Sequence, residues 1–180
     1  QRQMCIRDRP EKQGLYSPEN EHDNCGAGFI CSLQGKKTND IIHKALDILD
    51  CLEHRGAVSA DGKTGDGAGI LIEIPHEFLK DQCSFNLPEF GEYSVGMVFL
   101  PKKDNQRSFC IGVLEAEFEN QGLNVLGWRK VPVRTEIVGK IAAQTEPKIM
   151  QIFVGKGDKK ITEQNFKNKL FCARKISEHK

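Results

Sequence analysis

One internal cysteine, Cys25, stands where a polar, turn-forming run meets an apolar segment. The run before it is Glu21-His22-Asp23-Asn24, and Gly26-Ala27-Gly28-Phe29-Ile30 follows it. A thiol at the junction of an accessible loop and a buried segment suggests a nucleophile. Because a thiol with a pKa near 8.5 is only partly ionised at pH 7, a catalytic one needs a base or an electropositive setting.

The α-amine of the same residue can be that base, since its pKa of roughly 7.7–8.0 suits proton transfer near neutral pH. It becomes free only if the bond between Asn24 and Cys25 is cut, and the thiol itself can attack the preceding carbonyl. Gly26, without a Cβ, then lets the backbone pass close to a substrate. The pattern therefore predicts that the residues before Cys25 are a leader that is removed.

Two other interpretations of Cys25 stay open on the residues alone. It can be a buried cysteine that begins a strand, because cysteine is among the residue types most often buried. It can also belong to a zinc site, since His22-x-x-Cys25 and Cys51-x-x-His54 have ligand-like spacing. Against zinc, the thiol of Cys51 is expected to face the core from a helix, and neither pair has the usual knuckle turns.

Arg55, between His54 and Gly56, also has two interpretations. It can cap a helix end and complement the helix dipole. It can instead point inward, where its charge would favour a nearby thiolate and its fork could hold carboxylate or backbone oxygens. The glycine-rich run Thr64–Gly69 is not a phosphate loop, because it lacks both nucleotide-binding spacings and leads into a strand.

The elements that position these residues follow from the apolar periodicity. Ala27–Leu33 is predicted to be a strand buried on both faces, and Ala68–Ile74 a second strand. Between them, a helix capped by Thr38 or Asn39 carries an apolar stripe as far as Leu52, with Gly56 just beyond its end.

The rest of the chain alternates between helices and strands, without repeats. The predicted elements are a short helix from Pro75, a strand at Ser94–Leu100, a helix from Asp104 to Gly122, an extended piece at Val125–Val133, a helical turn at Ile137–Ala143, a strand at Ile149–Val154 and a helix from Thr162. Because the last helix is expected to run through Ala173–Lys180 without a cap, we read the chain as the N-terminal part of something longer.

Composition excludes several classes of function. The 180 residues carry a formal net charge of +1 with both signs interspersed, so neither nucleic acid nor a membrane is an expected partner. No apolar run approaches the ~20 residues of a membrane helix. Seven cysteines at irregular spacing are a poor disulfide framework. We therefore expect a reducing compartment, with six of the seven thiols as small core residues.

Several motifs resemble the beginning of glutamate synthase large chains. The most specific are Gly14–Pro18 with Glu21–Phe29, Ala45–Leu52 with His54–Ala57, and Ala60-Asp61 with Thr64–Leu71. Supporting motifs follow later in the chain: Gly127-Trp128-Arg129, Val131-Pro132-Val133, Glu146-Pro147, Gln151-Ile152-Phe153, Lys169-Leu170-Phe171 and Ala173-Arg174-Lys175. The resemblance covers the chain from about Gly14 to its end.

This resemblance implies a class II, N-terminal-nucleophile glutamine amidotransferase domain. The implied domains are a leader over residues 1–24 and a partial, truncated amidotransferase domain over residues 25–180. The implied fold class is α+β, a four-layer αββα sandwich that is incomplete at its C-terminal side. Residues 1–9 fit neither domain, and are either a disordered tail or a stretch foreign to the natural gene.

The resemblance also implies the reaction. The thiolate of Cys25 would attack the side-chain amide of glutamine, release ammonia and leave a glutamyl thioester for water to hydrolyse, with the freed α-amine as general base. The resemblance implies no metal ligand for this half-reaction. The implied supporting residues are Arg55, Gly26 and His54; possible pocket-lining residues are Thr64 and Asp66; and the cleavage site is Asn24–Cys25.

In the whole enzyme, ammonia would react with 2-oxoglutarate at a distant FMN site that receives electrons through an iron–sulfur cluster; this segment is expected to bind no cofactor. The implied partners are glutamine, the remaining domains of the same chain, and a small electron-transfer subunit or ferredoxin. The expected location is the cytoplasm, or a plastid in a photosynthetic eukaryote.

The resemblance places the oxyanion hole and the glutamine-clamping groups beyond this chain. Since removing one oxyanion donor costs about 10²–10³ in rate, the 180-residue chain alone is expected to be inactive. Two alternatives remain: another class II amidotransferase, which would make phosphoribosylamine, glucosamine phosphate or asparagine, and a non-catalytic Cys/His zinc-binding module.

Overall fold

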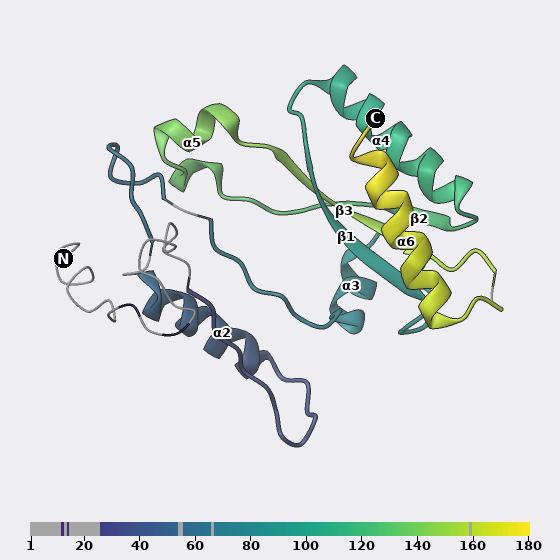
Figure 1. Cartoon of the computed structure of the whole chain (residues 1–180), viewed down its shortest axis with the longest axis horizontal. Helices are drawn as coiled ribbons and strands as arrows, with labels where there is room; N and C mark the ends of the chain where they lie inside the picture. Colours follow the sequence, from purple (N-terminus) through teal and green to yellow (C-terminus); the bar gives the residue numbers. More distant parts are fainter. Residues whose placement is uncertain (1–11, 13, 15–25, 54–55, 66, 159) are drawn as a thin grey trace. The chain divides into compact units, whose positions relative to one another are not determined.

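The computed structural model describes residues 12, 14, 26–53, 56–65, 67–158 and 160–180. The chain divides into two compact units, residues 1–71 and residues 72–180, whose elements are labelled in Figure 1. No helix among the described residues is both long enough and apolar enough to cross a membrane.

The helix of the first unit, α2 (Asn39–Cys51), matches the predicted helix closely. Thr38 is its N-cap in an extended conformation, and Asp40 in the first turn pairs with Lys44 at 2.7 Å. At the other end, the backbone N–H of Leu52 donates to the carbonyls of Ile48 and Leu49, at 3.1 and 3.0 Å. No residue of α2 is fully buried, and its apolar stripe is half-exposed.

The two strands predicted in the first seventy or so residues are not formed. Ala27–Leu33 and Ala68–Ile74 have no strand assignment, and Phe29 and Leu33 are 90% and 99% exposed. The prediction of a strand buried on both faces is therefore wrong for this structure. An apolar run becomes a strand only when a neighbouring strand pairs its backbone groups, and the one isolated bridge among the described residues is Val58–Gly65.

The second unit is built on a three-stranded antiparallel sheet of order β1-β3-β2. Its strands are β1 (Tyr93–Leu100), β2 (Asn124–Lys130) and β3 (Lys148–Gly155). All three agree with predicted extended segments to within a few residues. In the central strand β3, the last four residues are buried in succession, as expected for a strand that is covered on both faces.

Among the described residues of the second unit, five helical segments accompany the sheet. They are α3 (His76–Gln82), α4 (Asp104–Asn120), η3 (Thr135–Ile137), α5 (Lys140–Thr145) and α6 (Glu163–Ser177). The predicted helix from Thr162 is formed, with Thr162 as the N-cap of α6, whose side chain accepts a hydrogen bond from the N–H of Asn165. Asp104 is the first residue of α4, as in the predicted helix. The last helix, α6, ends at Ser177, so its predicted continuation through Lys180 is wrong.

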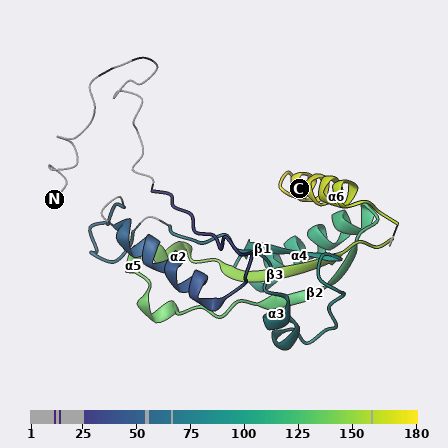
Figure 2. The same ribbon diagram turned by 90° about the horizontal axis from the view of Figure 1, so that it is seen from below.

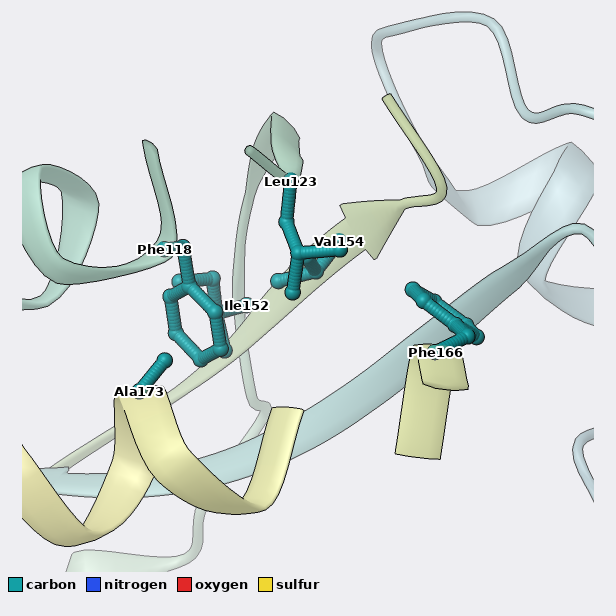
Figure 3. Close-up of a cluster of buried hydrophobic side chains, with 6 residues drawn as sticks. All are labelled: Phe118, Leu123, Ile152, Val154, Phe166 and Ala173. Atoms are coloured by element: carbon teal, nitrogen blue, oxygen red, sulfur yellow. The ribbon is translucent and has the colours of Figure 1, made fainter. Parts of the chain in front are cut away.

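Two apolar clusters cover the two faces of the sheet because successive residues of β3 point to opposite faces. Ile152 and Val154 pack with side chains of α4 and α6 (Figure 3). Phe153, fully buried, packs on the other face with Leu79 of α3 and Tyr93 of β1. Figure 2 shows α4 and α6 on one side of the sheet and α3 on the other.

The predicted α+β class agrees with this mixture of helices and an antiparallel sheet. The described residues form a single named sheet, so the second sheet of a four-layer sandwich is not present among them.

The expectation that most cysteines are core residues is wrong. Of the five cysteines that the structure describes, three are exposed and two are half-buried: Cys31, Cys51 and Cys172 in the first group, Cys83 and Cys110 in the second. In α6, for example, the fully buried position is the adjacent Ala173, because a helix turns consecutive residues to different sides.

Candidate functional site

Most of the predicted site residues lie outside the described residues. These are Asn24, Cys25, His54, Arg55 and Asp66. Two others, Gly26 and Thr64, are described, and both belong to the first unit. The structure thus describes the segments that adjoin the predicted nucleophile and the predicted pocket.

The segment that follows Cys25 lies against one face of α2. A Cβ built on Gly26 would be 2.8 Å from Cδ2 of Leu52, and one built on Gly28 would be 2.6 Å from Cγ2 of Ile48. Real Cβ contacts are essentially never this short. Ile48 and Leu52 are four positions apart, so they lie on one side of the helix. The segment therefore runs antiparallel to α2, with Gly26 at the helix's C-terminal end.

A tight turn gives the segment this direction. The N–H of Gly35 donates to the carbonyl of Ser32 at 3.0 Å, and the N–H of Lys36 donates to the Ser32 side chain at 3.2 Å. Gly35 has a φ of +66°, a conformation that glycine adopts without a steric cost. The chain reverses here and then enters α2.

Thr64 lies in a hairpin that is closed by a bridge between Val58 and Gly65. The N–H of Ser59 donates to the Thr64 carbonyl at 2.7 Å, and the N–H of Gly62, with a φ of +69°, donates to the Ser59 carbonyl at 3.0 Å. Thr64 is half-buried in this arrangement.

Asp61 organises the hairpin from inside the loop. Its Oδ1 accepts hydrogen bonds from the N–H groups of Lys63 and Thr64, at 3.1 and 2.7 Å. Its Oδ2 accepts a hydrogen bond of 2.6 Å from the Thr64 hydroxyl. Sequence reasoning assigned no role to Asp61, although an aspartate followed by glycine is a turn signal that could have indicated one.

An ion pair lies in the first turns of α2. The hydrogen bond from the Lys44 ammonium to Asp40 raises the pKa of Lys44 above its ordinary value. The last turn of α2 contains no basic residue. Since Arg55 lies outside the described residues, its two interpretations, helix-end cation and inward charge, both stay predictions.

Among the described residues, no three His, Cys, Asp or Glu side chains gather in a way that could hold a metal ion. The described residues therefore do not fit an iron–sulfur cluster. Three of the four ligands of the zinc alternative, His22, Cys25 and His54, lie outside the described residues. The fourth, Cys51, is exposed on α2, so the expectation that its thiol faces the core is wrong.

Among the described residues of the second unit, two surface hollows have volumes of about 450 and 620 Å³. The hollow of about 620 Å³ has a mixed lining, in which apolar side chains such as Ile111 and Met150 accompany the ion pair of Lys102 and Glu146, at 2.7 Å. Neither hollow contains a predicted site residue.

Comparison with known proteins gives consistent matches. The family described as "Glutamine amidotransferases class-II" matches residues 25–180. "Glutamate synthase [NADPH] large chain" of Bacillus subtilis (strain 168) is 41% identical over 177 residues, which cover 98% of this chain and 12% of that relative. "Glutamate synthase [NADH]" of Saccharomyces cerevisiae is 43% identical over 178 residues, 92% of this chain and 8% of the relative.

A third relative, "Ferredoxin-dependent glutamate synthase 1, chloroplastic/mitochondrial" of Arabidopsis thaliana, is 39% identical over 176 residues, 94% of this chain and 11% of the relative. The chain thus spans about a tenth of the length of the curated relatives it matches.

Proposed function

Because the chain belongs to the class II glutamine amidotransferases, we propose that it forms the glutamine-hydrolysing domain of a glutamate synthase, with Cys25 as the nucleophile. The observation that carries this proposal is the range of the family match, which begins at residue 25. The relatives that match nearly the whole chain are named glutamate synthases, which favours this enzyme over other class II amidotransferases.

In the proposed reaction, residues 1–24 are removed and Cys25 becomes the N-terminus. Its α-amine takes the thiol proton, and the thiolate attacks the Cδ carbon of glutamine. The carbon–nitrogen bond of the amide breaks, and the departing nitrogen takes a proton and leaves as ammonia. Water then attacks the glutamyl thioester, which releases glutamate and returns the proton to the thiolate.

The described geometry supports Cys25, His54 and Arg55 as neighbours in this site. Cys25 is covalently joined to Gly26, which is in contact with Leu52. His54 and Arg55 follow Leu52 by two and three positions. The close approach of Gly26 and Gly28 to α2 therefore explains how residues from two segments can meet at one end of this helix. Arg55 would stabilise the thiolate and hold substrate oxygens there.

Thr64 and Asp66 are proposed to line the glutamine pocket. The observation that supports this proposal is the hairpin from Val58 to Gly65, whose hydrogen bonds hold the backbone on both sides of Thr64. Asp66 follows this hairpin directly.

We also propose that residues 25–180 are part of a four-layer αββα sandwich. Apolar side chains that such a fold would cover are exposed in both units, as Phe29 and Leu33 are in the first and Met97 and Phe99 in the second. Ala27–Leu33 and Ala68–Ile74 would then be strands of the second sheet, paired once the sandwich is complete.

The remaining chemistry of a glutamate synthase would belong to other parts of the polypeptide. These parts would bind FMN and an iron–sulfur cluster and would combine the ammonia with 2-oxoglutarate. The names of the relatives include both NAD(P)H-dependent and ferredoxin-dependent enzymes. A small electron-transfer subunit or ferredoxin is accordingly the proposed electron partner, and the cytoplasm or a plastid the proposed location.

Glutaminase activity of the complete gene product tests the proposal. Cys25→Ala should abolish the release of ammonia from glutamine, whereas ammonia-dependent glutamate synthesis at the flavin site should continue. Cys172→Ala is the matched control, because Cys172 is an exposed thiol on α6, outside the proposed site. It should retain the activity of the wild type.

Retained glutaminase activity in Cys25→Ala would overturn the proposal. The zinc alternative makes a different prediction, namely stoichiometric zinc in the purified protein that is lost in Cys51→Ala.

A further inference from the structure

We propose that the hollow of about 620 Å³ in the second unit is a binding site for a small dicarboxylate, with Lys130 and Lys148 as the groups that hold its two carboxylates. Its volume is within the range of about 300–1,000 Å³ that is usual for small-molecule sites. All predicted residues of the amidotransferase site belong to residues 1–71. The inference therefore goes beyond the proposed function and does not depend on it.

The hollow lies where one end of the sheet meets the beginning of α4. Lys130 is the last residue of β2 and Lys148 is the first residue of β3, and both line the hollow. Arg107 and Ile111 line it from the first two turns of α4. Because these two residues are four positions apart, they lie on the same side of the helix. Elements far apart in the sequence thus contribute side chains to one hollow.

The two lysines share one face of the sheet with Met150. Lys130 is directly opposite Met150 in the register of β2 and β3, and Lys148 is two positions before Met150 in β3. Residues two apart in a strand point to the same face. The Cβ atoms of diagonal neighbours on two strands are about 7–8 Å apart. The two ammonium groups therefore come from neighbouring positions, with the buried side chain of Met150 beside them.

The carboxylates that line the hollow are paired with other cations. Glu146 pairs with Lys102 at 2.7 Å, and Asp104 pairs with Arg107 in the first turn of α4. These two ion pairs leave the charges of the remaining lysines uncompensated.

Within the described part of the chain, the ammonium groups of Lys130 and Lys148 have no hydrogen bond or ion pair with another residue. Two like charges at neighbouring positions repel each other, and a bound dianion would remove this repulsion. The charges of the hollow therefore favour a ligand with two negative charges.

The apolar part of the lining, Ile111 and Met150, distinguishes between kinds of dianion. A phosphate group is compact and would not cover these side chains. A dicarboxylate with a short methylene chain has a charge at each end and an apolar middle, which fits two separate ammonium groups beside an apolar surface. A monocarboxylate would leave one ammonium group uncompensated. The lining therefore selects a small dicarboxylate.

NMR of the complete gene product, with ¹³C-labelled methionine methyl groups, tests the site locally. The probe is glutarate, and the signal of Met150 is assigned by its loss in Met150→Leu. Glutarate should shift this signal along a saturable curve, because its methylene groups would contact the Met150 side chain. Glutarate bound elsewhere in the complete protein would leave this signal unchanged, so the dissociation constant that the curve gives belongs to this hollow.

Lysine variants test the two proposed ligand-binding groups. Lys130→Gln/Lys148→Gln should raise the Kd for glutarate at least about fivefold, because two exposed ion pairs with the ligand are lost. The matched control is Lys80→Gln/Lys160→Gln, which removes the same charge from two exposed lysines that do not line the hollow. The control should keep the Kd within about twofold of the wild type.

Two further probes test the class of ligand. Butyrate, a monoanion with a similar apolar chain, and inorganic phosphate should each bind at least about fivefold more weakly than glutarate. A Met150 signal that glutarate does not shift would overturn the inference, as would equal Kd values for the wild type and Lys130→Gln/Lys148→Gln. Butyrate or phosphate that binds as tightly as glutarate would overturn it too. If the lysine variant does not fold, the comparison of the three probes on the wild type decides alone.

Discussion

Two glycines determine how closely the segment after Cys25 approaches α2. Gly26 and Gly28 face Leu52 and Ile48 at distances that leave no room for a Cβ. An alanine at either position would have to displace a branched side chain or the backbone of the segment. Because residue 25 adjoins this contact, the two glycines affect both the stability of the chain and the position that the proposed nucleophile can take.

The first prediction concerns Gly28. Gly28→Ala should destabilise the chain by about 1–3 kcal/mol, because its Cβ would overlap the side chain of Ile48. Urea unfolding measures the change, and Ile48→Ala in the same chain should recover part of the loss. Gly69→Ala is the control, since a Cβ there meets nothing within 4 Å. Equal stability of the two glycine variants would contradict the described packing.

The second prediction concerns alkaline pH. Burial raises the pKa of the Cys83 thiol above its ordinary 9.0, although the charge of Arg129 partly opposes this, and burial also raises the pKa of Tyr93. The folded state therefore holds these protons more tightly than the unfolded state. The resulting stability is fully present below the unfolded pKa and is lost as the pH rises through the folded pKa.

Unfolding free energy should therefore fall as the pH rises above about 9, and Cys83→Ala should show a shallower fall than the wild type. Urea titrations at a series of pH values measure both slopes. Identical slopes for the two proteins would contradict the burial of this thiol.

At the scale of elements, the second unit follows from its sequence more completely than the first. Each strand of the sheet and both long helices lie close to the segments that periodicity predicts, because apolar residues of one element meet those of another within the same unit. The helix predicted from Thr162 begins where expected, with Thr162 as its N-cap. Trp128 of β2 packs on the core and donates to Glu115 at 2.7 Å.

The first unit shows where prediction from sequence fails. Ala27–Leu33 has the composition of a buried strand, but composition does not supply the neighbouring strand that would pair with it. The carboxylate network of Asp61 was missed for a different reason. Its hydrogen bonds depend on a hairpin geometry that the run Asp61–Thr64 only suggests. For Cys25 and Arg55, the sequence carries the whole prediction, because both lie outside the described residues.

The third prediction compares two glycines in different elements. Gly127 lies at the bulge of β2, where a Cβ would be 2.6 Å from the ring of Phe85, so Gly127→Ala should cost about 1–3 kcal/mol. Gly112 is exposed within α4, with nothing within 4 Å of its Cβ position. Gly112→Ala should therefore stabilise the chain by about 0.5–1 kcal/mol. Thermal unfolding should give shifts of opposite sign, and shifts of the same sign would contradict the assignment of these elements.

At the scale of the whole molecule, both units expose several large apolar side chains. Exposed apolar surface of this kind is typical of a face that packs against another part of a protein. In the sheet of the second unit, Met97 and Phe99 are two positions apart in β1, and their side chains are 52% and 65% exposed. They share one face of the sheet, since they are two positions apart in a strand. The proposed sandwich would bury this face.

The fourth prediction tests that burial. In the complete gene product, Met97→Glu/Phe99→Glu should lower the unfolding free energy by at least about 3 kcal/mol, because two carboxylates would enter an apolar interface. Phe109→Glu is the control: this phenylalanine is 62% exposed on α4, outside the proposed sheet contact. Similar effects of the double variant and the control would contradict the sandwich.

The central claim is that Cys25 is the N-terminal nucleophile, and one measurement addresses it directly. The complete gene product is inactivated with 6-diazo-5-oxo-norleucine, an electrophile shaped like glutamine, and its peptides are mapped by mass spectrometry. We predict one adduct, on the thiol of a peptide that begins at Cys25 with a free α-amine. An adduct on another cysteine, or an intact Asn24–Cys25 bond in the active enzyme, would contradict the claim.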